Sequence, residues 1–249
     1  MATTSTSQRN AGLSIHLVTA SGVLAGFLAL EAAYNGEVRR SLLWLVVCQI
    51  LDGIDGPIAR KLDVTLHAPH IDGHVLDLVV DYVTCVVVPT VLLVHLHLPP
   101  ARINSVLVAA ILVSSALWFA RVDQETDDAW FRGFPGMWNI VVPSFILLDT
   151  SRTTVAVVCF VGCALQLSNV EFPHIVRARA LRPVTVSVAV LYFATFVLLS
   201  ATYPEDRWGL RNVLLVAPLY LAAIVVWRTF FPTRTILGHR ITPPAPEAS

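Results

Sequence analysis

The sequence predicts an all-α protein, a polytopic membrane helical bundle with about eight transmembrane helices. Hydrophobic residues make up 55% of the 249 residues and charged residues only 14%, which is far from the average of soluble domains. The apolar residues also occur in continuous blocks rather than in amphipathic stripes. About 20 such residues are enough for a helix to cross a bilayer.

Eight apolar blocks follow one another along the chain: 11–34, 41–62, 73–97, 103–120, 137–148, 153–167, 184–203 and 213–231. The fifth block, 137–148, is short for a membrane span. Together the blocks predict one membrane domain over residues 11–232, after a short N-terminal segment at 1–10. The polar, Pro-rich stretch at 233–249 predicts a disordered C-terminal tail.

The distribution of basic residues predicts the orientation in the membrane. With the N-terminus in the cytoplasm, 11 of the 17 Lys and Arg residues fall on the cytoplasmic side and 6 on the other. Cytoplasmic loops are the ones that carry an excess of basic residues. Both termini and the connection between the second and third blocks are therefore expected in the cytoplasm. The net charge of zero argues against nucleic-acid binding, which needs a basic stripe.

Four aspartates interrupt the second and third blocks. Asp52 and Asp55 are three residues apart, Asp77 and Asp81 are four apart, and both spacings place a pair on one face of a helix. The short connection at 61–72 makes the two helices antiparallel neighbours, so the pairs can converge. Four bare carboxylates would repel one another, and hard divalent cations such as Mg²⁺ or Mn²⁺ relieve that repulsion. The spacing therefore predicts a site for two cations, which suits phosphoryl transfer.

Small residues and an arginine accompany the aspartates. Gly53, Gly56 and Ala59 leave the backbone of the second block bare, and Gly73 does the same one turn before Asp77. Gly in a helix costs about 1 kcal/mol relative to Ala, and close approach of a ligand is a good reason for it. Arg60 adds a planar fork of donors that matches phosphate oxygens.

Two other interpretations stay open at this point. Acids at a helix end can be ordinary interfacial residues, with Arg60 and Lys61 as positive-inside anchors. Acids inside a membrane can also line an ion or proton pathway, which would make the protein a cation-coupled transporter. The glycines and the arginine favour a nucleotide-like ligand over a bare ion.

These residues resemble the signature of the CDP-alcohol phosphotransferases, membrane enzymes that move a phosphatidyl or related group from a CDP-linked donor to an alcohol. The matching positions are Asp52-x2-Asp55-Gly56-x2-Ala59-Arg60 and Gly73-x3-Asp77-x3-Asp81. Twelve residues separate Arg60 from Gly73, more than in many members. In this longer spacer, and in "WFRGFPGMWN" and "FPHIVRARALRPVT", the chain is most similar to bacterial members that use choline.

The resemblance implies transfer of the phosphatidyl group from CDP-diacylglycerol to choline, giving phosphatidylcholine and CMP, in a bacterial inner membrane. Other acceptors, such as serine, inositol or glycerol phosphate, are the alternatives within the family. Carried over by position, the expected metal ligands are Asp52, Asp55, Asp77 and Asp81, with Asp81 also the catalytic base. The expected CDP contacts are Gly56, Ala59, Arg60 and Gly73. The family also implies a homodimer.

Choline would need aromatic faces, because its quaternary ammonium has no donor on nitrogen. The residues we assign to choline are Tyr82, Trp118, Trp130, Trp138 and Glu125. Aromatic residues are also enriched at membrane interfaces for reasons unrelated to ligands, so an interfacial belt is the alternative. The basic residues Arg177, Arg179 and Arg182 could bind donor phosphates or anionic lipid, or set the topology.

Overall fold

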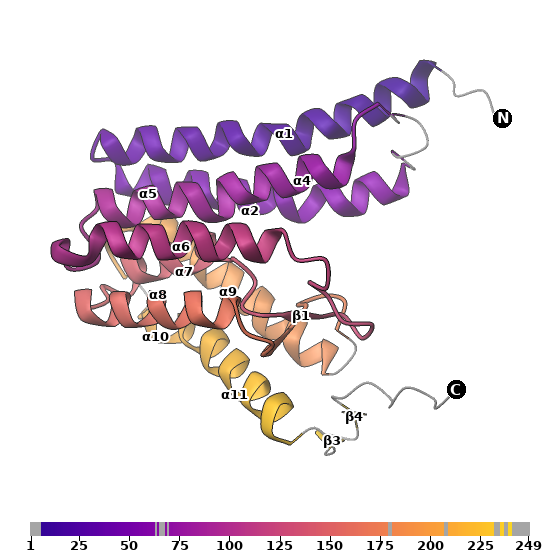
Figure 1. Cartoon of the computed structure of the whole chain (residues 1–249). Coiled ribbons are helices and arrows are strands. Elements are labelled where there is room, and N and C mark those ends of the chain that lie inside the picture. Colours follow the sequence, from indigo (N-terminus) through magenta and orange to yellow (C-terminus); the bar gives the residue numbers. More distant parts are fainter. Residues whose placement is uncertain are drawn as a thin grey trace.

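The computed structural model describes residues 6–62, 64, 68, 70–178, 181–206, 209–231, 235–236 and 239–240. Helices dominate this part of the chain (Figure 1). They are α1 (Thr6–Tyr34), α2 (Val38–Lys61), α4 (Gly73–Asp81), the π-helical η1 (Tyr82–Val87), α5 (Val88–His95), the 3₁₀ turn η2 (Ala101–Ile103), α6 (Asn104–Phe119), α7 (Trp138–Leu147), α8 (Arg152–Gln166), α9 (Arg182–Thr202), α10 (Arg211–Leu214) and α11 (Val216–Phe230).

Six helical segments of the described chain are long and apolar enough to cross a membrane: 10–34, 38–61, 73–95, 101–119, 182–202 and 211–230. The third of these joins α4, η1 and α5 into one continuous span. The fifth and sixth predicted blocks form the shorter apolar helices α7 and α8, of 10 and 15 residues. The predicted polytopic helical membrane protein is thus confirmed, with two of its eight apolar helices shorter than a full span.

Successive helices run up and down, so their connections gather at the two ends of the bundle (Figure 1). At one end the connections are short. At the other, which we call the long-loop end, lie the start of α1 and the connections 62–72, 120–137 and 167–181. The C-terminus of α11 reaches the same end.

Two short strands in these connections are a feature that the all-helical prediction did not include. β1 (Trp130–Arg132) pairs antiparallel with β2 (Glu171–Pro173), with Phe131 opposite Phe172. Strands of three residues give little periodicity, which explains why the sequence pattern does not predict them. The pairing ties the connection before α7 to the connection after α8.

The predicted C-terminal tail lies mostly outside the described residues. Within it, β3 (Thr235–Ile236) pairs with β4 (His239–Arg240). At the other end of the chain, α1 already begins at Thr6, before the first apolar block. The proposed domain boundaries stay a prediction.

The apolar core is divided among the helices. The largest buried cluster joins α1, α2, η1, α5, α6, α7 and α8, with Leu45, Leu92 and Trp138 among its fully buried members. A second cluster, centred on Phe196, joins α2, α7, α9 and α10. Exposed Leu, Val and Phe side chains cover much of the outer surface, as expected where lipid replaces water around the helices.

Candidate metal centre

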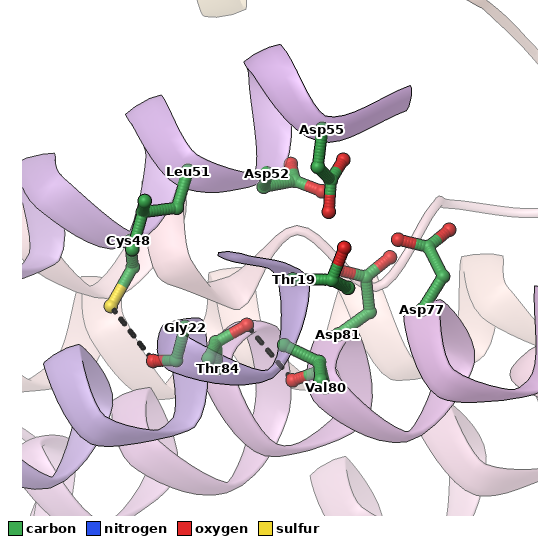
Figure 2. Close-up of a pocket in the computed structure, with 10 residues that line it drawn as sticks. All are labelled: Thr19, Gly22, Cys48, Leu51, Asp52, Asp55, Asp77, Val80, Asp81 and Thr84. Carbon is green, nitrogen blue, oxygen red and sulfur yellow. Dashed lines mark hydrogen bonds between the residues drawn. The ribbon is translucent and has the colours of Figure 1, made fainter. Parts of the chain in front are cut away.

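Carboxylate groups from two helices converge at the long-loop end of the bundle. Asp52 and Asp55 point from α2 toward α4, and Asp77 and Asp81 point back from α4 (Figure 2). One carboxylate oxygen from each of Asp52, Asp55 and Asp77 lies within 4.8 Å of the other two. The two helical pairs therefore face one shared space, as their spacing predicts.

Asp81 belongs to the same site. Its side chain lines the same pocket as those of Asp52, Asp55 and Asp77 (Figure 2). The other residues that line this pocket are Thr19, Gly22, Cys48, Leu51, Val80 and Thr84. The four carboxylates lie at one end of the pocket, and Cys48, Gly22 and Thr84 lie at the other (Figure 2).

The donor set fits divalent cations. Asp55 is only 6% exposed, and a buried carboxylate is costly unless its charge is compensated. Among the described residues, no Arg or Lys makes an ion pair with any of the four aspartates. At metal–oxygen distances of about 2.0–2.6 Å, oxygens bound to one cation lie up to about 5 Å apart. The three oxygens of Asp52, Asp55 and Asp77 all lie within 4.8 Å of one another, which is inside that range.

Helix α1 forms the third wall of the site, which the sequence analysis missed. It packs against both α2 and α4 and contributes Thr19 and Gly22 to the pocket. A Cβ atom at Gly22 would lie 3.0 Å from Cγ1 of Val80, and one at Gly26 would lie 3.0 Å from Cγ2 of Val88. These contacts show that α1 runs parallel to the α4–α5 span. The small residues let α1 approach closely, as in other membrane helix pairs.

Side-chain hydrogen bonds fix the start of α4. The carboxylate of Asp72 accepts hydrogen bonds from the backbone N–H groups of His74 and Val75, at 3.0 and 3.1 Å, and so caps the helix. The cap begins the helix at Gly73, one turn before Asp77. At the other end of α4, the π-helical turn η1 begins directly after Asp81, and such turns are frequent at functional sites.

The residues assigned to CDP lie beside the aspartates, and open space surrounds the neighbouring Gly53. A Cβ atom at Gly53 would meet nothing within 4 Å among the described residues, and one at Gly56 would meet the guanidinium of Arg60 at 3.3 Å. A Cβ atom at Gly73 would lie 3.2 Å from the ring of His16. Protein packing thus gives a reason for glycine at position 73 and none at position 53.

The connection between α8 and α9 carries His174 and Arg177. Burial lowers the pKa of His174, and the charges of Arg177 and Arg60 lower it further. Arg177 itself pairs with Glu125, Nη1 to Oε2, at 3.0 Å. Arg182 begins α9, and Arg179 lies outside the described residues.

The structure does not bring the five residues assigned to choline into the aspartate pocket, which other side chains line. The Tyr82 hydroxyl donates to the Leu112 carbonyl at 3.0 Å. Glu125 accepts a hydrogen bond from Arg177, in the connection between α8 and α9.

The three tryptophans of that set are buried by protein. The indole N–H of Trp118 donates to the Arg132 carbonyl at 2.9 Å, and that of Trp138 donates to the Ser115 hydroxyl at 3.0 Å. Trp130 is fully buried, and the guanidinium of Arg228 covers its ring, 4.3 Å from the centroid. Their assignment to choline stays a prediction.

The fold and the site define an integral membrane protein with a cluster of four aspartates, suited to divalent cations, at one end of a helical bundle. Comparison with known proteins agrees: the model of the CDP-alcohol phosphatidyltransferase family matches residues 15–166. The chain belongs to this family. Family members generally use divalent metal ions, and the aspartate cluster is where such ions would bind.

Several relatives are similar over most of their length. The phosphatidylcholine synthase of Pseudomonas aeruginosa is 36% identical over 216 residues, which are 86% of this chain and 90% of that protein. The phosphatidylcholine synthase of Rhizobium johnstonii is 35% identical over 220 residues, 88% of this chain and 90% of that protein. The phosphatidylcholine synthase of Borreliella burgdorferi is 30% identical, covering 89% and 94%.

Proposed function

We propose that this protein transfers the phosphatidyl group from CDP-diacylglycerol to choline, releasing phosphatidylcholine and CMP. The observation that carries the proposal is the convergence of Asp52, Asp55, Asp77 and Asp81 on one pocket at the end of a membrane bundle. Family membership supplies the CDP-linked donor. Relatives named phosphatidylcholine synthase, similar along nearly their whole length, support choline as the acceptor.

Two ions, Mg²⁺ or Mn²⁺, are proposed to bind among the four aspartates. When bound, they would neutralise the diphosphate and the charge that gathers on the leaving CMP. Asp52, Asp55 and Asp77, whose oxygens lie within 4.8 Å of one another, would be the shared ligands. Asp81, one turn after Asp77 on α4, would be the fourth ligand.

Asp81 is proposed as the general base. The choline oxygen forms a bond to the phosphorus that carries the diacylglycerol, and the bond from that phosphorus to the oxygen of CMP breaks. Asp81 accepts the hydroxyl proton as this exchange proceeds. A free aspartate is a weak base toward an alcohol, so the proton moves late in the transfer. A positioned group of this kind typically contributes about 10²- to 10⁴-fold to the rate.

Gly56, Ala59, Arg60 and Gly73 are proposed to lie against the CDP moiety. The open space over Gly53 supports this role, because no described side chain fills it. Arg60 is exposed and could turn its fork of donors toward the phosphates.

The site is proposed to face the cytoplasm. The excess of basic residues on that side, 11 against 6, supports a cytoplasmic N-terminus. The start of α1 lies at the same end of the bundle as the aspartate pocket (Figure 1), so both would share that side. Association into a homodimer stays a prediction from the family.

The direct test is to supply membranes containing this protein with CDP-diacylglycerol, labelled choline and Mn²⁺. We expect labelled phosphatidylcholine that disappears when the metal is chelated. Parallel reactions with labelled serine, inositol and glycerol phosphate identify the acceptor. Label in one of those lipids, and none from choline, would overturn the choice of acceptor.

A pair of variants tests the role of Asp81. Asp81→Asn should lower turnover about 10²- to 10⁴-fold, because the amide cannot accept the proton, while the KM for CDP-diacylglycerol changes little. Asp127→Asn, on the exposed connection between α6 and α7, is the matched control and should keep full activity. Near-normal turnover of Asp81→Asn would show that another group accepts the proton.

A further inference from the structure

His16 on α1 carries a buried polar atom that the proposed mechanism does not use. The residue is buried, with 7% of its surface exposed. Its Nε2 atom finds no hydrogen-bond partner in the part of the chain that the structure describes. A buried polar nitrogen without a partner costs about 1–3 kcal/mol, so its presence calls for a ligand that completes it.

His16 does not line the aspartate pocket itself but lies next to it. His16, Thr19 and Gly22 follow one face of α1 at spacings of three residues, and Thr19 and Gly22 line the pocket. The His16 ring lies against Gly73, with its Cε1 atom 3.2 Å from the place of a Cβ there. Gly73 is one turn before Asp77 on α4. His16 therefore lies one turn, or about 4.5 Å, beyond Thr19 toward the long-loop end.

The position of His16 indicates which part of the two substrates it can contact. The diacylglycerol chains must stay in the apolar layer, and the diphosphate is expected among the aspartates. The nucleotide is the water-soluble end of the donor, and it must extend from the aspartates toward the long-loop end. Choline offers no hydrogen-bonding group on its nitrogen for an imidazole to meet.

We infer that His16 contacts the nucleotide of the CDP-linked donor, with its Nε2 atom hydrogen-bonded to the CMP moiety at the mouth of the pocket. His16 and Gly73 then form one wall of the nucleotide subsite, and Gly53 and Gly56 on α2 form the other. The sequence suggests that Gly73 makes room for the ligand. In the structure it also makes room for the imidazole of His16. The inference rests on the proposed function only in taking a CDP-linked donor.

The test measures CMP binding separately from turnover. The purified protein with Mn²⁺ is titrated with CMP, and Kd is obtained from the rise in melting temperature. His16→Gln places an amide nitrogen near the position of Nε2, whereas His16→Asn is shorter and cannot reach it. We expect His16→Asn to weaken CMP binding about tenfold, equivalent to about 1.4 kcal/mol, and His16→Gln to stay within about threefold of the wild type.

His95 provides the matched control. It lies at the far end of the same pair of helices, on α5, where its Nε2 atom contacts the Ala33 carbonyl of α1 at 3.1 Å. His95→Asn should leave the Kd for CMP unchanged. Turnover assays should show a raised KM for CDP-diacylglycerol and an unchanged KM for choline in His16→Asn.

Equal CMP affinity of His16→Asn and the wild type would overturn the inference, and so would a change confined to the KM for choline. Its failure can be told apart from failure of the proposed function. If the wild type binds CMP but transfers no lipid to choline, the acceptor is wrong while the His16 contact is still measured by CMP binding. If choline is used and His16→Asn binds CMP normally, only the His16 contact is wrong.

Discussion

A buried arginine at the end of α11 provides the sharpest test of how the long-loop end is held together. The side chain of Arg228 is 3% exposed. Its Nη1 atom donates to the carboxylate of Asp128 at 2.8 Å, and its Nε atom donates to that of Glu171. Its guanidinium also covers Trp130. The last helix is thereby joined to both connections that carry β1 and β2. We consider the change Arg228→Met, which keeps most of the volume and removes the charge.

The loss of stability expected for Arg228→Met depends on how deeply its partners are buried. Removing one member of a buried ion pair costs about 3–5 kcal/mol. The side chains of Asp128 and Glu171 are 26% and 27% exposed, so water recovers part of their solvation, and about 2–3 kcal/mol is a better figure for partly exposed charges. Loss of the contact with Trp130 adds about 0.5–1 kcal/mol. The total is about 2.5–4 kcal/mol, and at about 2–4 °C per kcal/mol for a chain of this size the melting temperature should fall by about 5–16 °C.

The assay is thermal unfolding of the purified protein in detergent, with two comparison variants. Arg40→Met removes an exposed pair with Glu37, whose side chains are 61% and 49% exposed, and should shift the melting temperature by no more than about 2 °C, because such pairs contribute little. The triple variant Arg228→Met, Asp128→Asn, Glu171→Gln should melt above Arg228→Met, because no unpaired carboxylate is left. A single variant as stable as the wild type, or a triple variant no more stable than the single one, would refute the reasoning.

Two further predictions concern α1 packing and acid stability. Gly22→Leu should lower stability by about 1–3 kcal/mol through overpacking against Val80, whereas Gly53→Ala, with open space around it, should gain up to about 1 kcal/mol from helix propensity; equal melting temperatures for the two variants would contradict the assigned contacts. Burial, Arg177 and Arg60 hold the folded pKa of His174 below that of the unfolded chain, so the unfolded state takes up the proton first and stability falls as the pH drops below about 6.5. In His174→Asn the amide oxygen replaces the ring nitrogen as acceptor for the N–H groups of Val176 and Arg177. When the pH is lowered from about 7.5 to about 5.5, the melting temperature of this variant should fall by less than that of the wild type. An equal fall in both proteins would mean that another group titrates.

The aspartate site could be predicted because its signal is local. Within one helix, a spacing of three or four residues fixes a shared face, and the short connection at 62–72 brings the two faces together. The same reasoning could not include α1. Its contribution depends on how Gly22 and Gly26 pack against Val80 and Val88, which are far away in the sequence. The polar spacing of His16, Thr19 and Gly22 in an apolar block was the available signal.

The packing of the aromatic residues could not be predicted from the sequence. "WFRGFPGMWN" suggests rings near a cationic ligand, but a ring that binds choline and a ring that fills a core look alike in a sequence. Only the tertiary structure shows that Trp130 lies beneath Arg228 and that Trp138 donates to Ser115. The partners of Arg228 come from positions 128 and 171, and no local periodicity links three such distant segments.

The sequence by itself determined the membrane bundle and the two acidic helix faces, because apolar length and helical periodicity are properties of neighbouring residues. The tertiary structure decided what surrounds those acids: α1 as the third wall, a buried histidine at the mouth, and an arginine that joins the last helix to the connecting loops. Those features depend on which distant side chains meet when the helices pack, and burial gives each such contact its energy.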